Sequence, residues 1–105
     1  MSYQDHEEAI QRSLNYIEQH LAERLQLNRM AEHAGYSKFH FQRVFRKIIG
    51  KSVAEYVRER RMTQSARELI TTDQRVIDIA LNYQFKSQES FTRAFKKVYD
   101  ITPSE

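Results

Sequence analysis

Residues 35–47 read GYSKFHFQRVFRK, which we interpret as a short turn that leads into an amphipathic helix. An α-helix turns by about 100° per residue, so the residues of this stretch divide into two faces. The inner face is an apolar stripe typical of a packed helix: Phe41, Val44, Phe45, Ile48. The outer arc carries cations, an amide and an aromatic ring: Phe39, Gln42, Arg43, Arg46, Lys47. Such a surface is unusual for a helix without a partner.

The same pattern returns about fifty residues later. Five residues recur at an offset of fifty, namely Ser37, Phe41, Arg43, Phe45 and Lys47 as Ser87, Phe91, Arg93, Phe95 and Lys97. Upstream the offset is 49 and pairs Ala31 with Ala80, Gly35 with Gln84, and Tyr36 with Phe85. The change in offset falls in the turn, where an insertion is best tolerated. We therefore predict a duplicated helix–turn–helix unit, whose second outer arc is Gln88, Glu89, Thr92, Arg93, Lys96, Lys97.

Composition excludes several classes of protein. The 105 residues include no cysteine, so neither a disulfide framework nor a thiolate metal site can form. No apolar run approaches the ~18 residues of a membrane span, and the N-terminus lacks the pattern of a signal peptide. Helical periodicity runs through the chain while strand signals are weak, which predicts an all-α fold. The absence of cysteine suits a reducing cytoplasm, where we expect the protein to be located.

Positive charge is concentrated in one segment. Residues 1–34 carry three basic and six acidic side chains, residues 35–67 nine and two, and residues 68–105 five and six, so the three net charges are −3, +7 and −1. A localised basic region is typical of proteins that bind a polyanion. An ordinary solvated lysine and arginine surface would explain the charge alone equally well.

We expect six helices in this chain, near residues 5–21, 27–34, 38–49, 52–71, 76–83 and 88–99. They group into a first helix–turn–helix subdomain (1–51), a linker helix (52–71) and a second subdomain (72–105). The acidic first helix should lie away from a polyanion. In the linker helix, Val53, Tyr56 and Val57 should pack on the first subdomain, and Ala66, Leu69 and Ile70 on the second.

Turn and cap residues support these boundaries. Gly35 suits the left-handed residue that follows a helix, and Gln84 in the same conformation would cost about 1–2 kcal/mol. Ser37 and Ser87 are suited to cap the helices that follow them, and Ser52 with Glu55 forms a capping box. The sequence Thr102-Pro103 is typical of a helix start, so we expect a further helix and a chain that continues beyond residue 105.

These motifs together resemble the AraC/XylS family of bacterial transcription regulators, above all its MarA/SoxS/Rob branch. The segments that carry the resemblance are 34–45, 56–58 with 61–62, and 87–97, and the likeness extends from about residue 8 to residue 103. It implies about seven helices, the last of them truncated here, and two recognition helices (about 38–49 and 88–99) in successive major grooves of double-stranded DNA. It also implies an activator that engages RNA polymerase. This fragment would be monomeric, with effector binding or dimerisation in another domain of a longer protein.

The family's base-reading positions fall on Phe39, Gln42 and Arg43 in the first helix, and on Gln88, Glu89, Thr92 and Arg93 in the second. Three residues depart from the pattern: Phe39 replaces a tryptophan, Glu89 a glutamine and Gln84 a common glycine. We also expect phosphate contacts, which orient a protein on DNA without reading sequence, from Ser37, Lys38, Arg46, Lys47, Lys51, Ser87, Lys96 and Lys97.

Other interpretations stay open at this point. Arg46, Lys47 and Lys97 are also consistent with ordinary surface charge, and the ring of Phe39 with one tucked under a neighbouring side chain. The four histidines share no metal-ligand spacing, so we expect surface residues and neither a metal nor a cofactor. No nucleophile with a base and no phosphate-binding glycine loop is visible, which argues against an enzyme. A helical protein–protein interaction module is the alternative to DNA binding.

Overall fold

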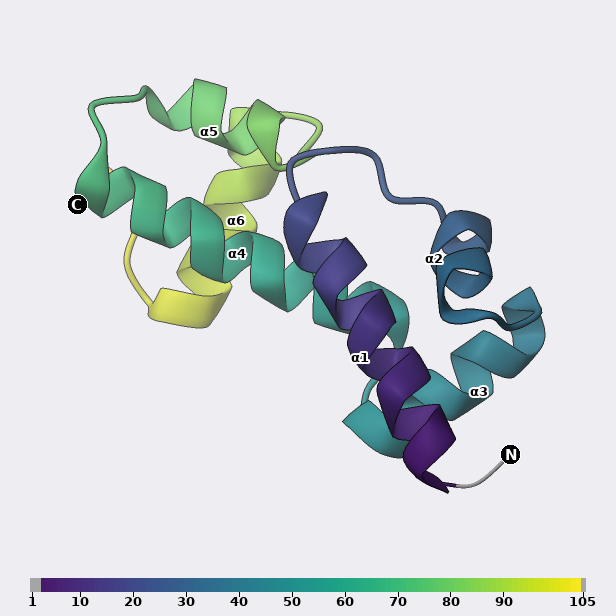
Figure 1. Cartoon of the computed structure of the whole chain (residues 1–105). Helices are drawn as coiled ribbons and strands as arrows, with labels where there is room; N and C mark the ends of the chain where they lie inside the picture. Colours follow the sequence, from purple (N-terminus) through teal and green to yellow (C-terminus); the bar gives the residue numbers. More distant parts are fainter. Residues whose placement is uncertain (1–2, 105) are drawn as a thin grey trace. The chain divides into compact units, whose positions relative to one another are not determined.

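The computed structural model describes residues 3–104, and its regular structure there is entirely helical, which confirms the all-α prediction (Figure 1). The helices in order are α1 (Tyr3–Gln19), α2 (Leu27–Ala34), α3 (Lys38–Ile49), α4 (Val53–Thr71), α5 (Val76–Asn82) and α6 (Gln88–Tyr99). The chain forms two compact units whose boundary falls between Arg58 and Glu59. The boundary lies inside α4, so this helix contributes residues to both units.

The first helix begins and ends two residues earlier than predicted, at Tyr3 and Gln19 instead of Asp5 and Leu21. After Gln19 the chain tightens, because the amide of His20 bonds to the carbonyl of Ile17 at 3.1 Å. Leu21 is nevertheless buried, as expected of the apolar stripe.

Unit 1 is built around the apolar faces of α1, α2 and α3, each of which packs against the other two (Figure 1). Phe41 and Phe45 of α3 are completely buried, and so is Ile17 of α1. The first turns of α4 close this core, since Val57 is buried and the ring of Tyr56 lies 5.7 Å from that of Phe45. Because the inner stripe of α3 is buried in this core, the outer arc of the helix faces solvent.

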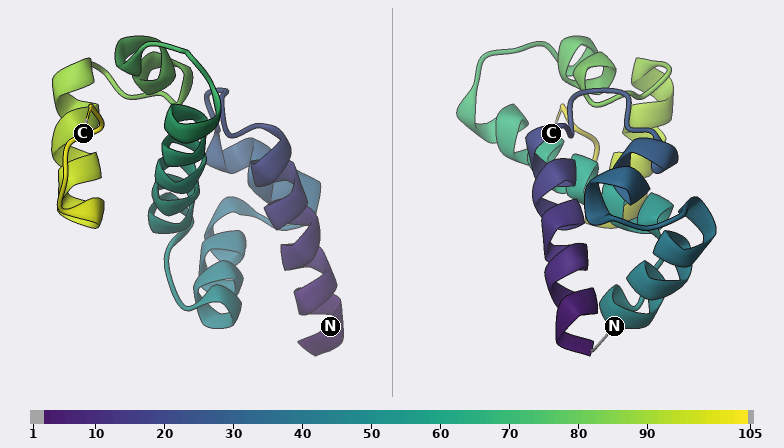
Figure 2. Two further views of the ribbon diagram at one scale, coloured as in Figure 1. Left: turned by 90° about the vertical axis from the view of Figure 1, so that its left-hand side faces the viewer. Right: turned by 45° about the vertical axis from the view of Figure 1, so that its right-hand side comes forward.

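Unit 2 has a smaller core, formed where the C-terminal part of α4 packs with α5 and α6 (Figure 2). Its buried residues are Met62, Ala80, Phe91 and Phe95, with five partly buried neighbours: Ala66, Leu69, Val76, Phe85, Ala94. The prediction for Ile70 was wrong, because its side chain is 85% exposed. A helical step of about 100° from Leu69 turns Ile70 away from the core face.

The turns that precede α3 and α6 have the same backbone geometry in the two units. Gly35 has φ 83° and Gln84 has φ 69°, so both are left-handed; this was predicted for Gly35 and left open for Gln84. In unit 1 the amide of Tyr36 donates to the carbonyl of Ala31 at 2.9 Å, and the equivalent bond from Phe85 to Ala80 measures 3.0 Å. The repeat in the sequence is thus a repeat in structure.

A second left-handed pair ends α3 and α6; the sequence predicts that Gly50 ends the first of these helices, but the equivalent role of Asp100 was not predicted. Gly50 has φ 85° and Asp100 has φ 65°. Their amides donate to equivalent carbonyls, of Arg46 at 2.9 Å and of Lys96 at 2.8 Å. The offset of fifty already aligns these residues, so the signal was present in the sequence.

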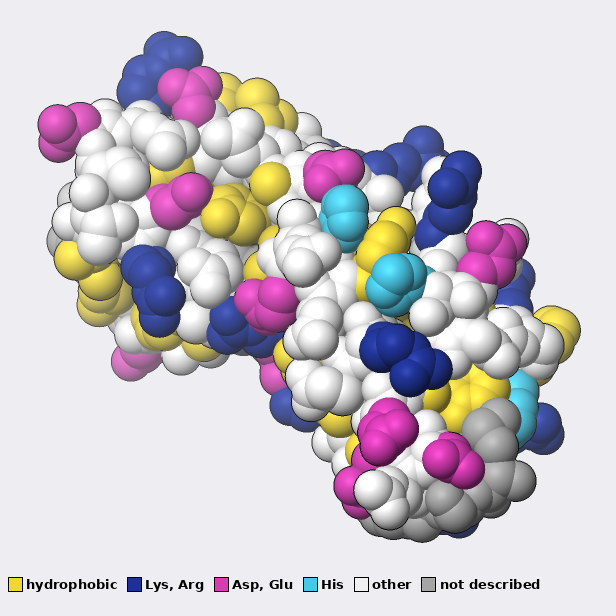
Figure 3. All heavy atoms as spheres, in the orientation of Figure 1, with side chains coloured by type: hydrophobic (Ala, Val, Ile, Leu, Met, Phe, Trp, Pro, Cys, Tyr) yellow, Lys and Arg dark blue, Asp and Glu magenta, His cyan; other side chains and the backbone are white. Residues whose placement is uncertain are grey.

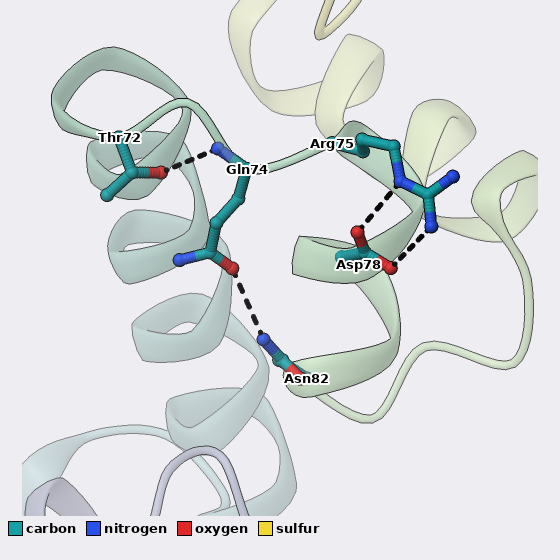
Figure 4. A network of polar contacts seen from close by, with 5 residues as sticks. All are labelled: Thr72, Gln74, Arg75, Asp78 and Asn82. Carbon is teal, nitrogen blue, oxygen red and sulfur yellow. Dashed lines mark hydrogen bonds and ion pairs between the residues drawn. The ribbon is translucent and has the colours of Figure 1, made fainter.

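Short polar contacts hold the connection between α4 and α5 (Figure 4). The amide of Gln74 donates to the Thr72 hydroxyl, and the Gln74 side chain accepts from Asn82 at 3.4 Å. Arg75 makes two bonds to the Asp78 carboxylate, at 2.9 and 3.3 Å. This pair ties the first turn of α5 to the residue before it, where no side chain caps the helix.

The chain after α6 forms a turn at Pro103 and Ser104. No helix begins at Thr102 within the described residues, and the last residue of the predicted start, Glu105, lies outside them.

Candidate nucleic-acid interface

The outer arc of α3 is exposed as the helical wheel predicted. Phe39, Gln42, Arg43, Arg46 and Lys47 are all solvent-accessible. The ring of Phe39 is 72% exposed, so the alternative in which it tucks under a neighbour is wrong. The ammonium group of Lys38 lies 5.8 Å from the centre of this ring, within range of a cation–π contact. An aromatic ring and several cations therefore share one solvent-facing surface.

Serine hydroxyls cap the starts of α3 and α6, as predicted. Ser37 Oγ accepts from the amide of His40 at 3.3 Å, and Ser87 Oγ accepts from the amide of Ser90 at 3.1 Å. The Ser87 hydroxyl also donates to the Ser90 hydroxyl at 3.1 Å. Amides in a first helical turn lack intrahelical acceptors and attract anions. Ser37 is exposed and Ser87 half-buried, so the first helix start is the more accessible to a phosphate.

Glu55 joins a helix cap to a basic residue of α3. Its amide donates to Ser52 Oγ at 3.1 Å and its carboxylate accepts from the Ser52 hydroxyl at 3.0 Å, which confirms the capping box. The same carboxylate lies 3.7 Å from the guanidinium of Arg46. Hydrogen bonds from Ser52, followed by the charges of Arg46 and Arg58, lower the pKa of Glu55 below its usual value. Arg46, a predicted phosphate contact, thus already has an anionic neighbour.

The outer arc of α6 has the same character, with one difference. Gln88, Glu89, Arg93, Lys96 and Lys97 are exposed, whereas Thr92 is half-buried. The four predicted base contacts of this helix line one open hollow of about 790 Å³, together with Ile77, Leu81, Lys86 and Ser87. Ile77 and Leu81 lie one turn apart on α5 and remain 38% and 50% exposed. Ile77 and Leu81 flank the buried pair Ile79 and Ala80 in the sequence, and their spacing of four residues was a signal in the sequence that we did not use.

Two histidines stand beside the outer arc of α3. Nδ1 of His6 is hydrogen-bonded to the Tyr36 hydroxyl, and the ring of His40 lies 4.8 Å from that of Tyr36 and 6.0 Å from that of His6. Burial raises the pKa of Tyr36, although the charge of Arg12 acts in the opposite direction. The two histidines line a hollow of about 270 Å³ together with Arg43, Val44, Lys47 and Ile48.

Of the four histidines expected at the surface, His33 is exposed and the other three, His6, His20 and His40, are half-buried. Their rings pack on tyrosines: His6 and His40 on Tyr36, and His20 on Tyr16 at 4.4 Å. The histidine side chain combines a flat ring with polar edges, so it packs well at the margin of a core.

Predicted phosphate contacts on α3 and after it differ in accessibility. Lys38 and Lys47 are exposed and Lys51 is half-buried. Acidic side chains instead gather over the N-terminal part of α1, as Figure 3 shows, and the exposed carboxylates there belong to Asp5, Glu7 and Glu8.

Residues 3–104 hold no group of three or more histidine, cysteine or carboxylate side chains placed to bind a metal ion. Within the same range, no helix has the length and apolar character needed to cross a membrane.

The chain matches a helix-turn-helix family model and is similar to several bacterial transcription regulators. Residues 30–105 match the family model of the helix-turn-helix domain. The chain is 54% identical over 91 residues to the HTH-type transcriptional activator AarP of Providencia stuartii, covering 87% of this chain and 67% of AarP. It is 37% identical over 100 residues to the regulatory protein SoxS of Salmonella typhimurium, covering 95% of this chain and 94% of SoxS.

One longer relative and one solved structure are also similar to the chain. The chain is 50% identical over 98 residues to YbfP, an uncharacterized HTH-type transcriptional regulator of Bacillus subtilis, covering 93% of this chain and only 33% of YbfP. The DNA-binding domain of the global transcriptional factor AdpA, solved with a target DNA, superposes with a TM-score of 0.79 at 25% identity, covering 88% of this chain and 83% of that one. The chain belongs to the AraC family of helix–turn–helix transcription regulators, within its MarA/SoxS/Rob-like group.

Proposed function

We propose that this chain reads double-stranded DNA with α3 and α6 and thereby activates bacterial transcription. One observation carries the proposal: the outer arcs of the two helices are exposed, basic and repeated, with Arg43 and Arg93 at equivalent positions. A solvated surface has no reason to repeat an arginine at the same helical angle.

The exposed side chains have the donor and acceptor groups that base reading requires. Arg43 and Arg93 suit bidentate bonds to guanine O6 and N7, and Gln42 and Gln88 suit adenine N6 and N7. Phe39 can pack on a thymine methyl group. Glu89 can accept from cytosine N4 and, being anionic, disfavours bases that offer only acceptors. Thr92, half-buried beside Arg93, completes the second reading surface.

Phosphate contacts would orient the two helices without adding sequence preference. We assign this role to Ser37, Lys38, Arg46, Lys47, Lys51, Ser87, Lys96 and Lys97. The 19 residues of α4 correspond to about 28 Å of helix, which is close to the ~34 Å repeat of the major groove. This length supports binding in successive major grooves, with subdomains 1–51 and 72–105 on either side of the linker helix 52–71.

The activator role rests on AarP, which is named an activator and shares 54% identity with the chain. Activation requires an encounter with the transcription machinery, so we include RNA polymerase as a partner, in the bacterial cytoplasm. We propose that the chain acts as a monomer, because its two units already supply two reading helices. Effector binding would belong to another part of the longer relatives.

Selection from a random duplex pool tests the proposal directly. We expect a bipartite site whose elements lie about one helical turn apart. Arg43→Ala and Arg93→Ala should each weaken binding to that site by about 1–3 kcal/mol, since a bidentate contact is lost. Both variants should keep the circular dichroism melting curve, and Arg93→Ala should leave binding to unrelated DNA nearly unchanged.

Arg24→Ala is the matched control, because Arg24 is an exposed arginine outside both reading helices. It should bind the selected site as the unmodified chain does. Unchanged affinity in the folded Arg43→Ala, Arg93→Ala double variant would overturn the proposal in favour of a protein-interaction module. Selection of a single short element would limit base reading to one helix.

A further inference from the structure

The hollow between the first turns of α1 and the middle of α3 brings together four groups that carry or can acquire positive charge. It is lined by His6 from α1 and by His40, Arg43 and Lys47 from α3, with Val44 and Ile48 as apolar walls. Its volume of about 270 Å³ is several times the ~30 Å³ of one water molecule, so a phosphate group can enter with part of its hydration. These four side chains can together bind an anion when the histidines are protonated.

The histidines are held in place, which distinguishes the hollow from a loose basic surface. Nδ1 of His6 is engaged by the Tyr36 hydroxyl, which leaves Nε2 to donate to a ligand when the ring is protonated. The ring of His40 stands edge-on to both His6 and Tyr36. A preorganised donor loses less conformational entropy when a ligand binds.

Charged groups around the histidines favour an anion as the ligand. From α3 the facing charges are Arg43 and Lys47. From α1, Arg12 and Asp5 both act on the neighbouring Tyr36 with opposite sign. The carboxylates of Glu7 and Glu8 lie about 100° and 200° around α1 from His6, which turns them away from it. An anion in the hollow would offset the repulsion between the charges of Arg43 and Lys47.

We propose that this hollow binds a phosphate of the DNA backbone, and that His6 and His40 take up protons as the phosphate enters. The inference rests on the proposed DNA binding and adds a contact from α1, the acidic helix that the sequence placed away from DNA. Histidine is the side chain whose ordinary charge change falls between pH 5 and 8. Binding to any duplex should therefore strengthen as pH falls through that range.

The test measures affinity by fluorescence anisotropy at constant ionic strength from pH 8 to pH 5.5, for the selected duplex and for an unrelated one. The unmodified chain should bind both about tenfold more tightly at pH 5.5, which corresponds to a proton held about tenfold more tightly in the complex. Its salt dependence should steepen by about one phosphate contact. The His6→Gln, His40→Gln double variant should lose most of both effects.

Two further variants separate charge from folding. His40→Arg carries a permanent charge, so it should bind at pH 8 as tightly as the unmodified chain binds near pH 6. His33→Gln is the matched control, because His33 is an exposed histidine of the same unit that stacks on Tyr16, and it should keep the full pH dependence. Calorimetry in buffers of different ionisation enthalpy should show proton uptake on DNA binding that the double variant lacks.

Each result bears on one claim. An equal pH dependence in the unmodified chain and the double variant, with both folded, overturns the phosphate hollow even if sequence-specific binding stands. No preference for the selected duplex, together with a histidine-dependent pH effect on both duplexes, refutes base reading and retains the hollow. Inorganic phosphate titrated without DNA separates the sources of the anion. Saturation at millimolar phosphate with no histidine effect on duplex binding would show a free-phosphate site and overturn the backbone contact.

Discussion

The residue at the left-handed position of each turn, before α3 and before α6, determines the conformational free energy of that turn. A β-carbon added to Gly35 would meet no atom within 4 Å, so a side chain there is opposed by backbone conformation and not by crowding. The equivalent residue of unit 2 is Gln84, which accepts that conformation without glycine's freedom. The two equivalent positions therefore compare glycine with a residue that has a β-carbon in the same turn.

We expect Gly35→Ala to lower the free energy of unfolding by about 1–2 kcal/mol, the usual cost of a left-handed residue with a β-carbon. Gln84→Gly should stabilise by a smaller amount, because glycine also gains roughly 0.5–1 kcal/mol of freedom in the unfolded chain. Urea unfolding followed by circular dichroism measures both. A Gly35→Ala variant as stable as the unmodified chain would contradict this account of the turn.

At the scale of an element, α4 depends on an exposed capping box. Ser52 and Glu55 exchange hydrogen bonds across its first turn. The pKa of Glu55 lies below its ordinary value of 4.5, chiefly because Ser52 donates to the carboxylate. A carboxyl group whose pKa is lower in the folded state stabilises the fold above its unfolded pKa, and this contribution disappears as pH falls through the folded value.

Glu55→Gln should therefore be less stable than the unmodified chain at pH 7, and the difference should vanish as pH falls well below 4.5. Glutamine keeps an acceptor for the cap, so the comparison isolates the charge. Thermal unfolding from pH 7 to pH 3 measures the difference. A stability gap that stays constant across this range would assign the effect to packing instead of ionisation.

At the scale of the whole molecule, the two units differ in the strain that their backbones hold. Unit 1 places glycine at both left-handed positions, Gly35 and Gly50, whereas unit 2 places Gln84 and Asp100 there. The helices before the two turns, α2 and α5, both lack a side-chain cap, so the caps do not explain a difference between the units. The left-handed positions of unit 2 therefore have a higher conformational free energy than those of unit 1.

Hydrogen exchange should show this difference. We expect amides of α5 and α6 to exchange faster than those of α2 and α3, because unit 2 opens at a lower free energy. Mass spectrometry of labelled peptides measures both units in one sample. The Gln84→Gly variant should slow exchange in α5 and α6 and leave α2 and α3 unchanged, and faster exchange in unit 1 would refute the ranking.

The helices and their inner faces were predictable because apolar periodicity and caps are local properties of sequence. The bounds of α2, α3 and α6 agree with their predictions. The outer arcs were predictable for the same reason. Contacts between distant residues were not, since nothing local joins His6 to Tyr36 thirty residues away or Arg46 to Glu55. Ile70 was misplaced because it lies about 100° around α4 from Leu69, on the side that faces away from the core.

The ion pair between Arg46 and Glu55 has a consequence for how quickly this protein could scan a chromosome. In the proposed complex a backbone phosphate would take the place of the carboxylate beside Arg46, and every stretch of DNA offers the same phosphate. This exchange therefore lowers the affinity for specific and non-specific DNA by the same factor, and the ratio of the two affinities does not change. Weaker binding to non-specific DNA shortens the residence time at each non-specific site. The Glu55 carboxylate would therefore shorten the search, whereas the base contacts alone would determine which site is finally bound.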